Sequence, residues 1–446
     1  MSEVVATAQQ GLTGKYQPYP EYKDSGVEWL GDVPEHWVLS RVKDVAVVFG
    51  GYPFDSQRFS PDVGVPLIRI RDINTELTAV YFDGDVPQEA IVENNDVLIG
   101  MDGEFNVARW KGGKAALNQR VACVRTDSDE LTTLLFYTLP FSLKVVNDLT
   151  YYTTVKHLSL EDIKKTIFAL PQGEELSNIA AFLDYETARI DRLIAQQQRL
   201  IELLKEKRQA VISHAVTKGI NPDAPMKDSG VEWLGQVPEH WSVIYIKHLS
   251  EVKRGASPRP IDDPKYFDED GEYAWTRIAD VSNAGMYLTS TTQRLSALGS
   301  SLSVRLNAGE LFLSIAGTVG KPCITIFKSC IHDGFVYFPS LKINNKFFYY
   351  IFDAGQAYLG LGKMGTQLNL NTETVGGIKI GLPPVDEIEN IIGHIEQQKE
   401  KYEKLISKAS DTIELLQERR TALISAAVTG KIDLRGWTQP AEEVAA

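Results

Sequence analysis

The chain has 446 residues, 43% of them hydrophobic and 24% charged, an ordinary composition for a folded protein of two or three domains. No apolar run approaches the ~20 residues that a membrane-spanning helix needs. The first residues lack the basic and apolar regions of a secretory signal, so we expect a cytoplasmic protein. The net charge of −13 argues against a uniformly basic surface, but it leaves room for a local basic groove.

The cysteines and short motifs give no sign of a metal or catalytic centre. Cys123, Cys323 and Cys330 form no CxxC pair, so we expect reduced thiols rather than a zinc site or disulfides. Segment 317–321 (GTVGK) lacks the spacing of a phosphate-binding loop, and Pro322 stands where that loop needs Ser or Thr. We therefore assign no metal ligand and no catalytic residue.

An internal repeat organises the chain. After an N-terminal tail, residues 23–37 (KDSGVEWLGDVPEHW) return at 227–241 with a single change. Residues 201–217 (IELLKEKRQAVISHAVT) return at 413–429 as IELLQERRTALISAAVT. We call these repeated blocks the frame. The inserts between them are dissimilar, and this asymmetry favours one scaffold used twice to recognise two different things over a simple structural duplication.

The first insert, at ~40–155, has short β-type runs at 45–50, 65–73 and 95–101 with Gly and Pro between them. This texture predicts a compact α+β domain rather than a doubly wound sheet. Arg, Lys, Asn and Gln on strand ends and loops suit contacts with base edges and phosphates, although ordinary solvated loops have the same composition. The candidate contact residues are Arg69, Arg71, Asp72, Asp102, Phe105, Arg109, Lys111, Lys114, Gln119, Arg120, Tyr151, Tyr152 and Lys156.

A heptad pattern follows at 174–217 and returns in the second copy. A seam sustained over about six heptads predicts an amphipathic helix of ~44 residues, roughly 65 Å long. Such a helix must bury its seam, and the other copy is the simplest partner, in an antiparallel intramolecular coiled coil with a pseudo-two-fold; an intermolecular coiled coil is the alternative. The seam and partner-contact residues are Leu183, Ile190, Leu193, Leu204, Ile395, Tyr402, Leu405 and Leu416.

The second insert, at ~245–367, has similar strand-like runs at 272–281, 309–317 and 321–327. Arg277 and Asp280 fall at a place comparable to the strand end of the first insert that carries Arg69, Arg71 and Asp72. The candidate contact residues here are Lys253, Arg254, Ser257, Arg259, Arg277, Thr318, Lys321, Lys363, Gln367 and Asn369.

These observations predict an α+β protein with two globular recognition domains separated by two long antiparallel helices. The expected boundaries are a tail at 1–21, a first domain at 22–172, a helix at 173–218, a second domain at 219–383, a second helix at 384–430 and a tail at 431–446. The twin tryptophans of the frame are expected to pack the domains onto the helices.

The pattern resembles the specificity subunit of type I restriction-modification enzymes. The twin frame, the Leu-Pro entries to both helices at Leu170 and Leu382, and the helix endings at 215–217 and 427–432 carry the resemblance, as do MDGEFN (101–106) and LNQR (117–120). The match spans almost the whole chain, and its layout is specific.

The resemblance implies that each insert is a target recognition domain that reads one half of a split site in double-stranded DNA, with a nonspecific gap between the halves. It also implies that the two helices set this gap and dock two modification subunits, which use S-adenosylmethionine to methylate adenine. The resemblance further implies two restriction subunits that join them for ATP- and Mg²⁺-dependent translocation and cleavage. This chain has no methyltransferase, Walker A or helicase motif, so we expect it to be non-catalytic and to bind no cofactor itself.

Two other hypotheses are compatible with parts of this pattern. The first is a coiled-coil repeat scaffold that binds protein partners and no DNA, which the acidic net charge favours slightly. The second is an enzyme such as a nuclease, for which the sequence offers no motif.

Overall fold

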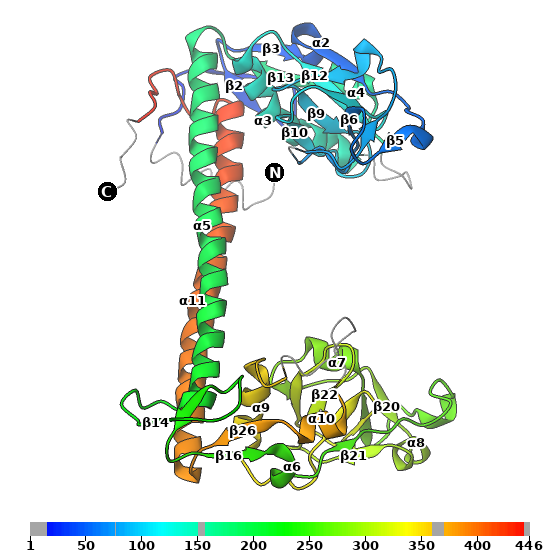
Figure 1. Cartoon of the computed structure of the whole chain (residues 1–446). Helices are drawn as coiled ribbons and strands as arrows, with labels where there is room; N and C mark the ends of the chain where they lie inside the picture. The colour runs from blue at the N-terminus through cyan, green and yellow to red at the C-terminus, as the bar shows by residue number, and fades with distance from the viewer. Residues whose placement is uncertain (1–15, 76, 150–156, 359–369, 441–446) are drawn as a thin grey trace. The chain divides into compact units, whose positions relative to one another are not determined.

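The computed structural model describes residues 16–75, 77–149, 157–358 and 370–440. The chain divides into two compact units, unit 1 (Met1–Gln198 with Ser410–Ala446) and unit 2 (Arg199–Ala409). Two long helices, α5 (Glu174–Lys218) and α11 (Val385–Val428), each contribute to both units (Figure 1). Among the described residues, no helix is long and apolar enough to cross a membrane.

Unit 1 contains two packed β-sheets. A four-stranded sheet has the order β10-β9-β12-β4, and a five-stranded sheet has the order β5-β7-β6-β11-β8. In the second sheet β6 and β11 are parallel. The strands are β4 (Val47–Gly50), β5 (Phe59–Ser60), β6 (Val65–Ile68), β7 (Tyr81–Phe82), β8 (Ile91–Val92), β9 (Val97–Gly100), β10 (Val107–Arg109), β11 (Ala115–Leu117) and β12 (Val121–Arg125).

The central strand β9 is apolar along its whole length because both of its faces are buried. Leu98 faces the second sheet, in a cluster with Ile68 and Leu117. Val97 and Ile99 face the opposite way and join the cluster that includes residues of α3 (Asp129–Leu149). Burying one such side chain contributes roughly 1.5–3 kcal/mol. The short helices α2 (Val42–Val45) and α4 (Leu160–Lys165) complete the domain.

Unit 2 also has two larger sheets, β17-β25-β22-β23-β19 and β20-β18-β24-β21. Its strands are β17 (Lys253–Arg254), β18 (Tyr273–Thr276), β19 (Tyr287–Leu288), β20 (Gln293–Leu295), β21 (Val304–Leu306), β22 (Leu311–Ser314), β23 (Pro322–Thr325), β24 (Ser329–Ile331) and β25 (Phe335–Tyr337). Its helices before α11 are α6 (Ile246–Leu249), α7 (Ile278–Asn283), α8 (Ala297–Ser301), α9 (Asn345–Asp353) and α10 (Thr372–Gly376).

The strand predicted at 272–281 is therefore too long. Strand β18 ends at Thr276, and the helix α7 begins at Ile278. The Asp280 carboxylate accepts the backbone N–H of Arg277 at 2.9 Å, which stabilises the first turn of a helix.

The two inserts share one topology despite their dissimilar sequences. The order β10-β9-β12-β4 corresponds to β23-β22-β25-β17, and the parallel pair β6–β11 corresponds to the parallel pair β18–β24. The frame strands also correspond: β1 (Tyr22–Asp24) pairs with β2 (Asp32–Pro34) as β14 (Met226–Asp228) pairs with β15 (Gln236–Pro238). Strand β3 (Val38–Arg41) pairs with β13 (Ile167–Leu170) as β16 (Ser242–Tyr245) pairs with β26 (Lys379–Leu382).

In each unit the frame tryptophan ties the globular domain to a long helix. The indole N–H of Trp37 donates to Oε1 of Glu175 at 3.0 Å, and Nε2 of His36 lies 2.8 Å from the other oxygen. In unit 2, Glu387 holds Trp241 and His240 at 3.1 and 2.7 Å. Since the tryptophans are 0% and 1% exposed, they pack domain against helix as the frame predicts.

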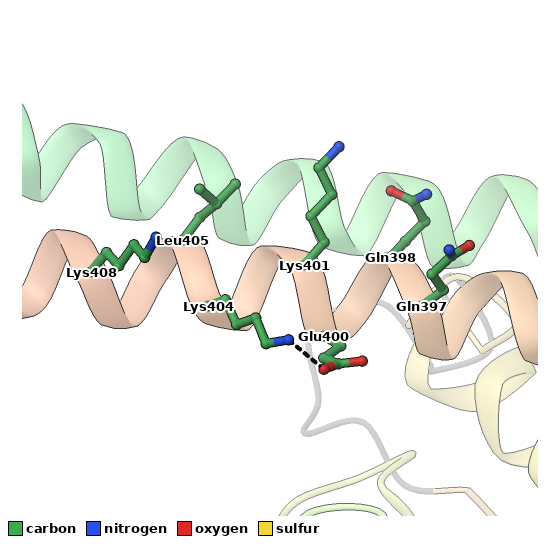
Figure 2. Close-up of a pocket in the computed structure, with 7 residues that line it drawn as sticks. All are labelled: Gln397, Gln398, Glu400, Lys401, Lys404, Leu405 and Lys408. Atoms are coloured by element: carbon green, nitrogen blue, oxygen red, sulfur yellow. Dashed lines mark hydrogen bonds and ion pairs between the residues drawn. The ribbon is translucent and has the colours of Figure 1, made fainter.

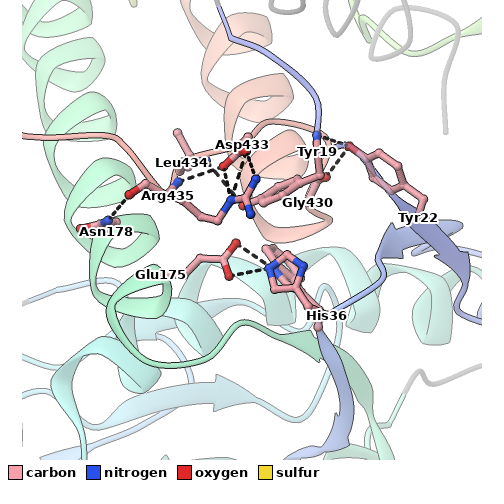
Figure 3. A network of polar contacts seen from close by, with 10 residues as sticks. Tyr19, Tyr22, His36, Glu175, Asn178, Gly430, Asp433, Leu434 and Arg435 are labelled. Carbon is pink, nitrogen blue, oxygen red and sulfur yellow. Dashed lines mark hydrogen bonds and ion pairs between the residues drawn. The ribbon is translucent and has the colours of Figure 1, made fainter.

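The described ends of the chain belong to the fold of unit 1, although the sequence predicted tails there. The Tyr22 hydroxyl donates to the carbonyl of Gly430 at 3.0 Å (Figure 3). The backbone N–H of Asp433 donates to the carbonyl of Gln17 at 2.7 Å. Tyr19 and Leu434 are 3% and 1% exposed, so both segments contribute apolar side chains to the core.

The long helices contact each other within each unit. In unit 1, Arg420 of α11 donates to Asp191 of α5 at 2.9 Å. In unit 2, Arg208 of α5 lies 3.7 Å from Glu403 of α11. Each helix is followed by a glycine with positive φ, Gly219 at +73° and Gly430 at +66°, a conformation that ends a helix without strain.

Candidate nucleic-acid interface

Four loops of unit 1 meet at one end of its sheets. We call them loop face 1: residues 51–54, 69–72, 101–106 and 118–120. Hydrogen bonds between backbones join the loops. The N–H of Gly51 donates to the carbonyl oxygen of Val121 at 3.0 Å, and the N–H of Met101 donates to the carbonyl oxygen of Arg120 at 3.0 Å. A side chain at Gly51 would lie 2.2 Å from the carbonyl oxygen of Asn118, so this close approach requires glycine.

Unit 2 repeats this construction with different residues. Loop face 2 comprises residues 255–259, 277–280, 315–318 and 332–334. The N–H of Gly255 donates to the carbonyl oxygen of Phe335 at 2.9 Å, and the N–H of Ile315 donates to the carbonyl oxygen of Gly334 at 2.9 Å. A side chain at Gly255 would lie 2.1 Å from the carbonyl oxygen of His332. The backbone scaffold is thus conserved between the two copies while its side chains differ.

Loop face 1 brings seven of the predicted contact residues together. Asp102 accepts from His157 at 2.8 Å and lies 3.3 Å from Arg120, whose side chain is 65% exposed. Gln119 and Arg71 are also exposed. Phe105, by contrast, is 3% exposed and packs in the hydrophobic core, so its side chain anchors the loop 101–106 and is not available for contact with DNA. The seven are Arg69, Arg71, Asp72, Asp102, Phe105, Gln119 and Arg120.

The same Arg-x-x-Asp turn follows the parallel strand in both units. In unit 1, Asp72 accepts the backbone N–H and the Nε of Arg69 at 3.1 and 2.8 Å. In unit 2, Asp280 accepts the backbone N–H of Arg277, whose Nε lies 3.8 Å away. Arg69 is therefore bound locally, which leaves Arg71 as the arginine of this turn that points into solvent.

Asp333 organises loop face 2. Its carboxylate accepts from Ser257 at 3.1 Å and from Arg259 at 2.8 Å, and its carbonyl oxygen accepts from Arg254 at 2.5 Å. Partial burial alone would raise the pKa of Asp333, but the Ser257 hydrogen bond and the charge of Arg259 hold it below 3.8. Beside it, burial lowers the pKa of His332 below 6.5, so its neutral form is favoured. The Arg259 side chain remains 71% exposed.

Ser282 of α7 holds two further predicted residues. Its hydroxyl lies 2.6 Å from that of Thr318, and its carbonyl oxygen accepts from Lys321 at 2.8 Å. Ser282, Asp333 and His332 are not among the residues predicted from the sequence. The Asp333-Gly334 turn between two apolar runs was a usable signal for the last two. Nothing in the sequence marked Ser282.

Other predicted residues lie away from the loop faces. Arg109 contacts Thr133 at 2.9 Å and Asp184 of α5 at 3.4 Å, with its guanidinium over the ring of Phe136. It therefore fastens strand β10 to the helices. Lys253 pairs with Glu251, while Lys111 and Lys114 are exposed on the loop before β11. Tyr151, Tyr152, Lys156, Lys363, Gln367 and Asn369 lie outside the described residues.

The described residues contain no candidate metal site and no activated cysteine. Their His, Cys, Asp and Glu side chains form no group of three or more that could hold a metal ion. All three cysteines are free and buried. Burial raises the pKa of Cys323 to about 12 and of Cys330 to about 11, so the unreactive thiol form is favoured in both.

The long helices keep apolar side chains on their surface. Of the eight residues predicted for the seam, Leu183, Ile190 and Ile395 are 0–3% exposed and Leu204 is 8% exposed, while Tyr402 and Leu416 are partly buried. Leu193 and Leu405 are 38% and 40% exposed. Leu405 lines an open groove along α11 with a volume of about 490 Å³. The other lining residues are Gln397, Gln398, Glu400, Lys401, Lys404 and Lys408 (Figure 2).

The model of the type I restriction modification DNA specificity domain matches residues 34–203 and 238–424, one match for each copy of the repeat. The chain belongs to this family. The EcoBI specificity subunit of Escherichia coli is 28% identical over 398 residues, which cover 84% of this chain and 82% of the relative. The MjaVIII specificity subunit of Methanocaldococcus jannaschii is 24% identical over 439 residues, with 90% and 94% covered.

Solved structures support the fold of this specificity subunit. A chain from a type I restriction-modification system aligns with a TM-score of 0.67 at 16% identity, over 89% of this chain and 98% of that one. The HsdS subunit from Thermoanaerobacter tengcongensis aligns with a TM-score of 0.53 at 17% identity, over 90% and 98%. The predicted resemblance is confirmed, and the chain recognises DNA as a specificity subunit. The hypothesis of a scaffold that binds no DNA is therefore set aside.

Proposed function

We propose that loop faces 1 and 2 each read one half of a bipartite site in double-stranded DNA. The observation that carries this proposal is the repeated backbone scaffold that presents different side chains in the two units. A scaffold repeated with equal geometry and unequal chemistry suits two half-sites of different sequence. Exposed Arg71, Gln119 and Arg120 on one face, and Arg259 on the other, have the donor groups that base edges and phosphates accept.

The long helices are proposed to fix the gap between the half-sites as an intramolecular antiparallel coiled coil. The ion pairs between α5 and α11 in each unit support this arrangement. The same helices are proposed to dock two modification subunits. Leucines exposed at the helix surface support this docking because apolar side chains that the chain itself leaves in water gain free energy when a partner buries them. Those side chains are Leu193, Leu200, Leu203, Leu405 and Leu415.

Catalysis is assigned to the partner subunits. In this proposal the modification subunits bind S-adenosylmethionine and methylate adenine, which they must flip out of the duplex. Two restriction subunits supply ATP- and Mg²⁺-dependent translocation and cleavage. The chain described here binds no cofactor, adds no catalytic group and acts in the cytoplasm.

Exchange of one insert tests whether each loop face reads its own half-site. Residues 40–155 would be replaced by the corresponding insert of another specificity subunit, and adenine methylation would be mapped genome-wide in a host that carries the modification subunit. The expected outcome is a new first half-site, with the second half-site and the gap unchanged. A reciprocal exchange of residues 245–367 is the matched control. Changes in both half-sites after a single exchange would contradict the proposal.

A further inference from the structure

In each unit, the C-terminal part of one long helix lies with the N-terminal part of the other, and the two surfaces formed in this way are equivalent in the repeat. The frame blocks 201–217 and 413–429 align residue for residue, and the carboxylates Glu175 and Glu387 hold the frame tryptophans in the same way. Ala210 therefore corresponds to Ala422, and His394 of α11 to Phe182 of α5.

In unit 1 this face is covered by the chain itself. Ala422 is 0% exposed, and it belongs to the same core cluster as Phe182. Tyr16 and Trp437, from the two end segments, pack edge-on against the Phe182 ring with centroid distances of 5.4 and 5.5 Å. Beside Ile190 and Arg419 there remains a hollow of about 70 Å³. Two aromatic side chains thus occupy the space along these helices.

In unit 2 the equivalent face is open. Ala210 and His214 are exposed, and a groove of about 460 Å³ lies between the end of α5 and α11. Val211, Ile220, Pro222 and Tyr402 give the groove apolar walls. Lys207 adds a cation, and His214 and His394 add imidazole rings with hydrogen-bonding nitrogens. The described residues that line the groove include no carboxylate, and Glu387 beside Gly219 is bound to Trp241 and His240, so the groove suits an aromatic side chain with an acidic neighbour.

We infer that this groove receives a segment of the modification subunit that carries an aromatic anchor next to an acidic residue. The segment takes the place in unit 2 that Tyr16 and Trp437 take in unit 1. The inference rests on the proposed docking of modification subunits to these helices, and it assigns one docking contact to a defined place. The two units then differ in how they contact modification subunits, since the groove is open in unit 2 and the equivalent surface of unit 1 is covered by Tyr16 and Trp437.

Paired substitutions test the groove in the full-length chain with the purified modification subunit. Ala210→Trp fills the groove, and Ala79→Trp places the same side chain on an exposed loop of unit 1. Lys207→Glu reverses a charge in the groove, and Lys205→Glu reverses an exposed charge on the same helix outside it. We expect Ala210→Trp and Lys207→Glu each to weaken assembly at least tenfold, while both controls assemble like the unchanged chain.

A photoreactive p-benzoylphenylalanine at position 218, an exposed residue one turn beyond His214 that does not line the groove, identifies the occupant in the assembled complex. The expected product is a crosslink to a peptide of the modification subunit that contains Trp, Tyr or Phe. Normal assembly of both groove variants, or crosslinks only within this chain or to a second copy, would overturn the inference and leave the proposed function standing. Failure of the unchanged chain to assemble would overturn the proposed docking itself.

Discussion

At the scale of single residues, a loop face separates side chains that hold the loops from side chains that are free to contact DNA. Asp72, Asp102 and Asp333 accept hydrogen bonds from neighbouring arginines, histidine or serine, so they order the loops. Arg71 and Arg259 extend into solvent. The residue types of this site could be predicted from the sequence, but the distinction between supporting and contacting side chains depends on burial and partners.

Arg71 gives the sharpest residue-level prediction. An arginine that donates two hydrogen bonds to a base contributes roughly 1–3 kcal/mol of discrimination. We expect Arg71→Ala to reduce DNA affinity of the assembled complex by that amount and to relax one position of the first half-site. Lys114→Ala, which removes an exposed cation away from loop face 1, should leave base preference unchanged. Binding to a panel of duplexes with single base changes measures both effects, and an unaltered panel for Arg71→Ala would remove Arg71 from the site.

Gly393 has a separate consequence for stability. It lies inside α11, is exposed, and has no atom within 4 Å of an added side-chain carbon. Because glycine is less favourable than alanine within a helix, Gly393→Ala should raise the free energy of unfolding by about 0.5–1 kcal/mol. Gly430→Ala is the contrasting variant, since its φ is +66° and the new carbon would lie 2.3 Å from Cδ of Pro34. Urea unfolding should show opposite signs for the two changes.

At the scale of elements, the strength of the sequence pattern decided what could be predicted. The heptads extend over forty-five and forty-four residues in α5 and α11, and long periodic segments are the most readable. Short strands were found near their true positions, but the helix α7 was predicted as strand. There the local hydrogen bond from Arg277 N–H to Asp280 determines the structure, while the apolar pattern of 272–281 suits either state.

Lengthening the helices tests their role as a spacer. Seven residues inserted after Gln198 in α5 and seven after Ala409 in α11 keep the heptad phase of both helices. The added rise is about 10 Å, the length of roughly three base pairs. We expect the methylated motif to keep both half-sites and to show a changed gap or loss of recognition. Seven residues inserted between Asp62 and Val63, in an exposed loop of unit 1 outside the helices and outside loop face 1, serve as the control. The original gap in the lengthened protein would argue that the helices do not set it.

At the scale of the whole molecule, the repeat closes on itself in unit 1. In unit 2 a continuous segment, residues 219–225, leads from α5 to strand β14. In unit 1 the equivalent path leaves α11 at Gly430 and reaches strand β1 through two separate segments, near 430–437 and 16–21. The sequence predicted tails at these positions because each segment alone is short and lacks a periodic pattern. Their pairing is visible only when residues more than 400 positions apart come together, as Tyr22 and Gly430 do.

This closure predicts that the chain tolerates a new starting point. In the permuted chain, Ala446 is joined to Met1 and the chain is opened between Asn221 and Pro222. The path from α11 to β1 in unit 1 then becomes continuous, and the path from α5 to β14 in unit 2 is interrupted. Asn221 and Pro222 are both exposed, which suits new termini. We expect the permuted protein to direct methylation to the same motif with the same gap. Opening between Leu98 and Ile99 instead, within the buried strand β9, should abolish folding. If the Asn221 permutant folded but lost the second half-site only, continuity of the 219–225 segment would be needed to hold the second domain on its helix, and the two connections would not be equivalent.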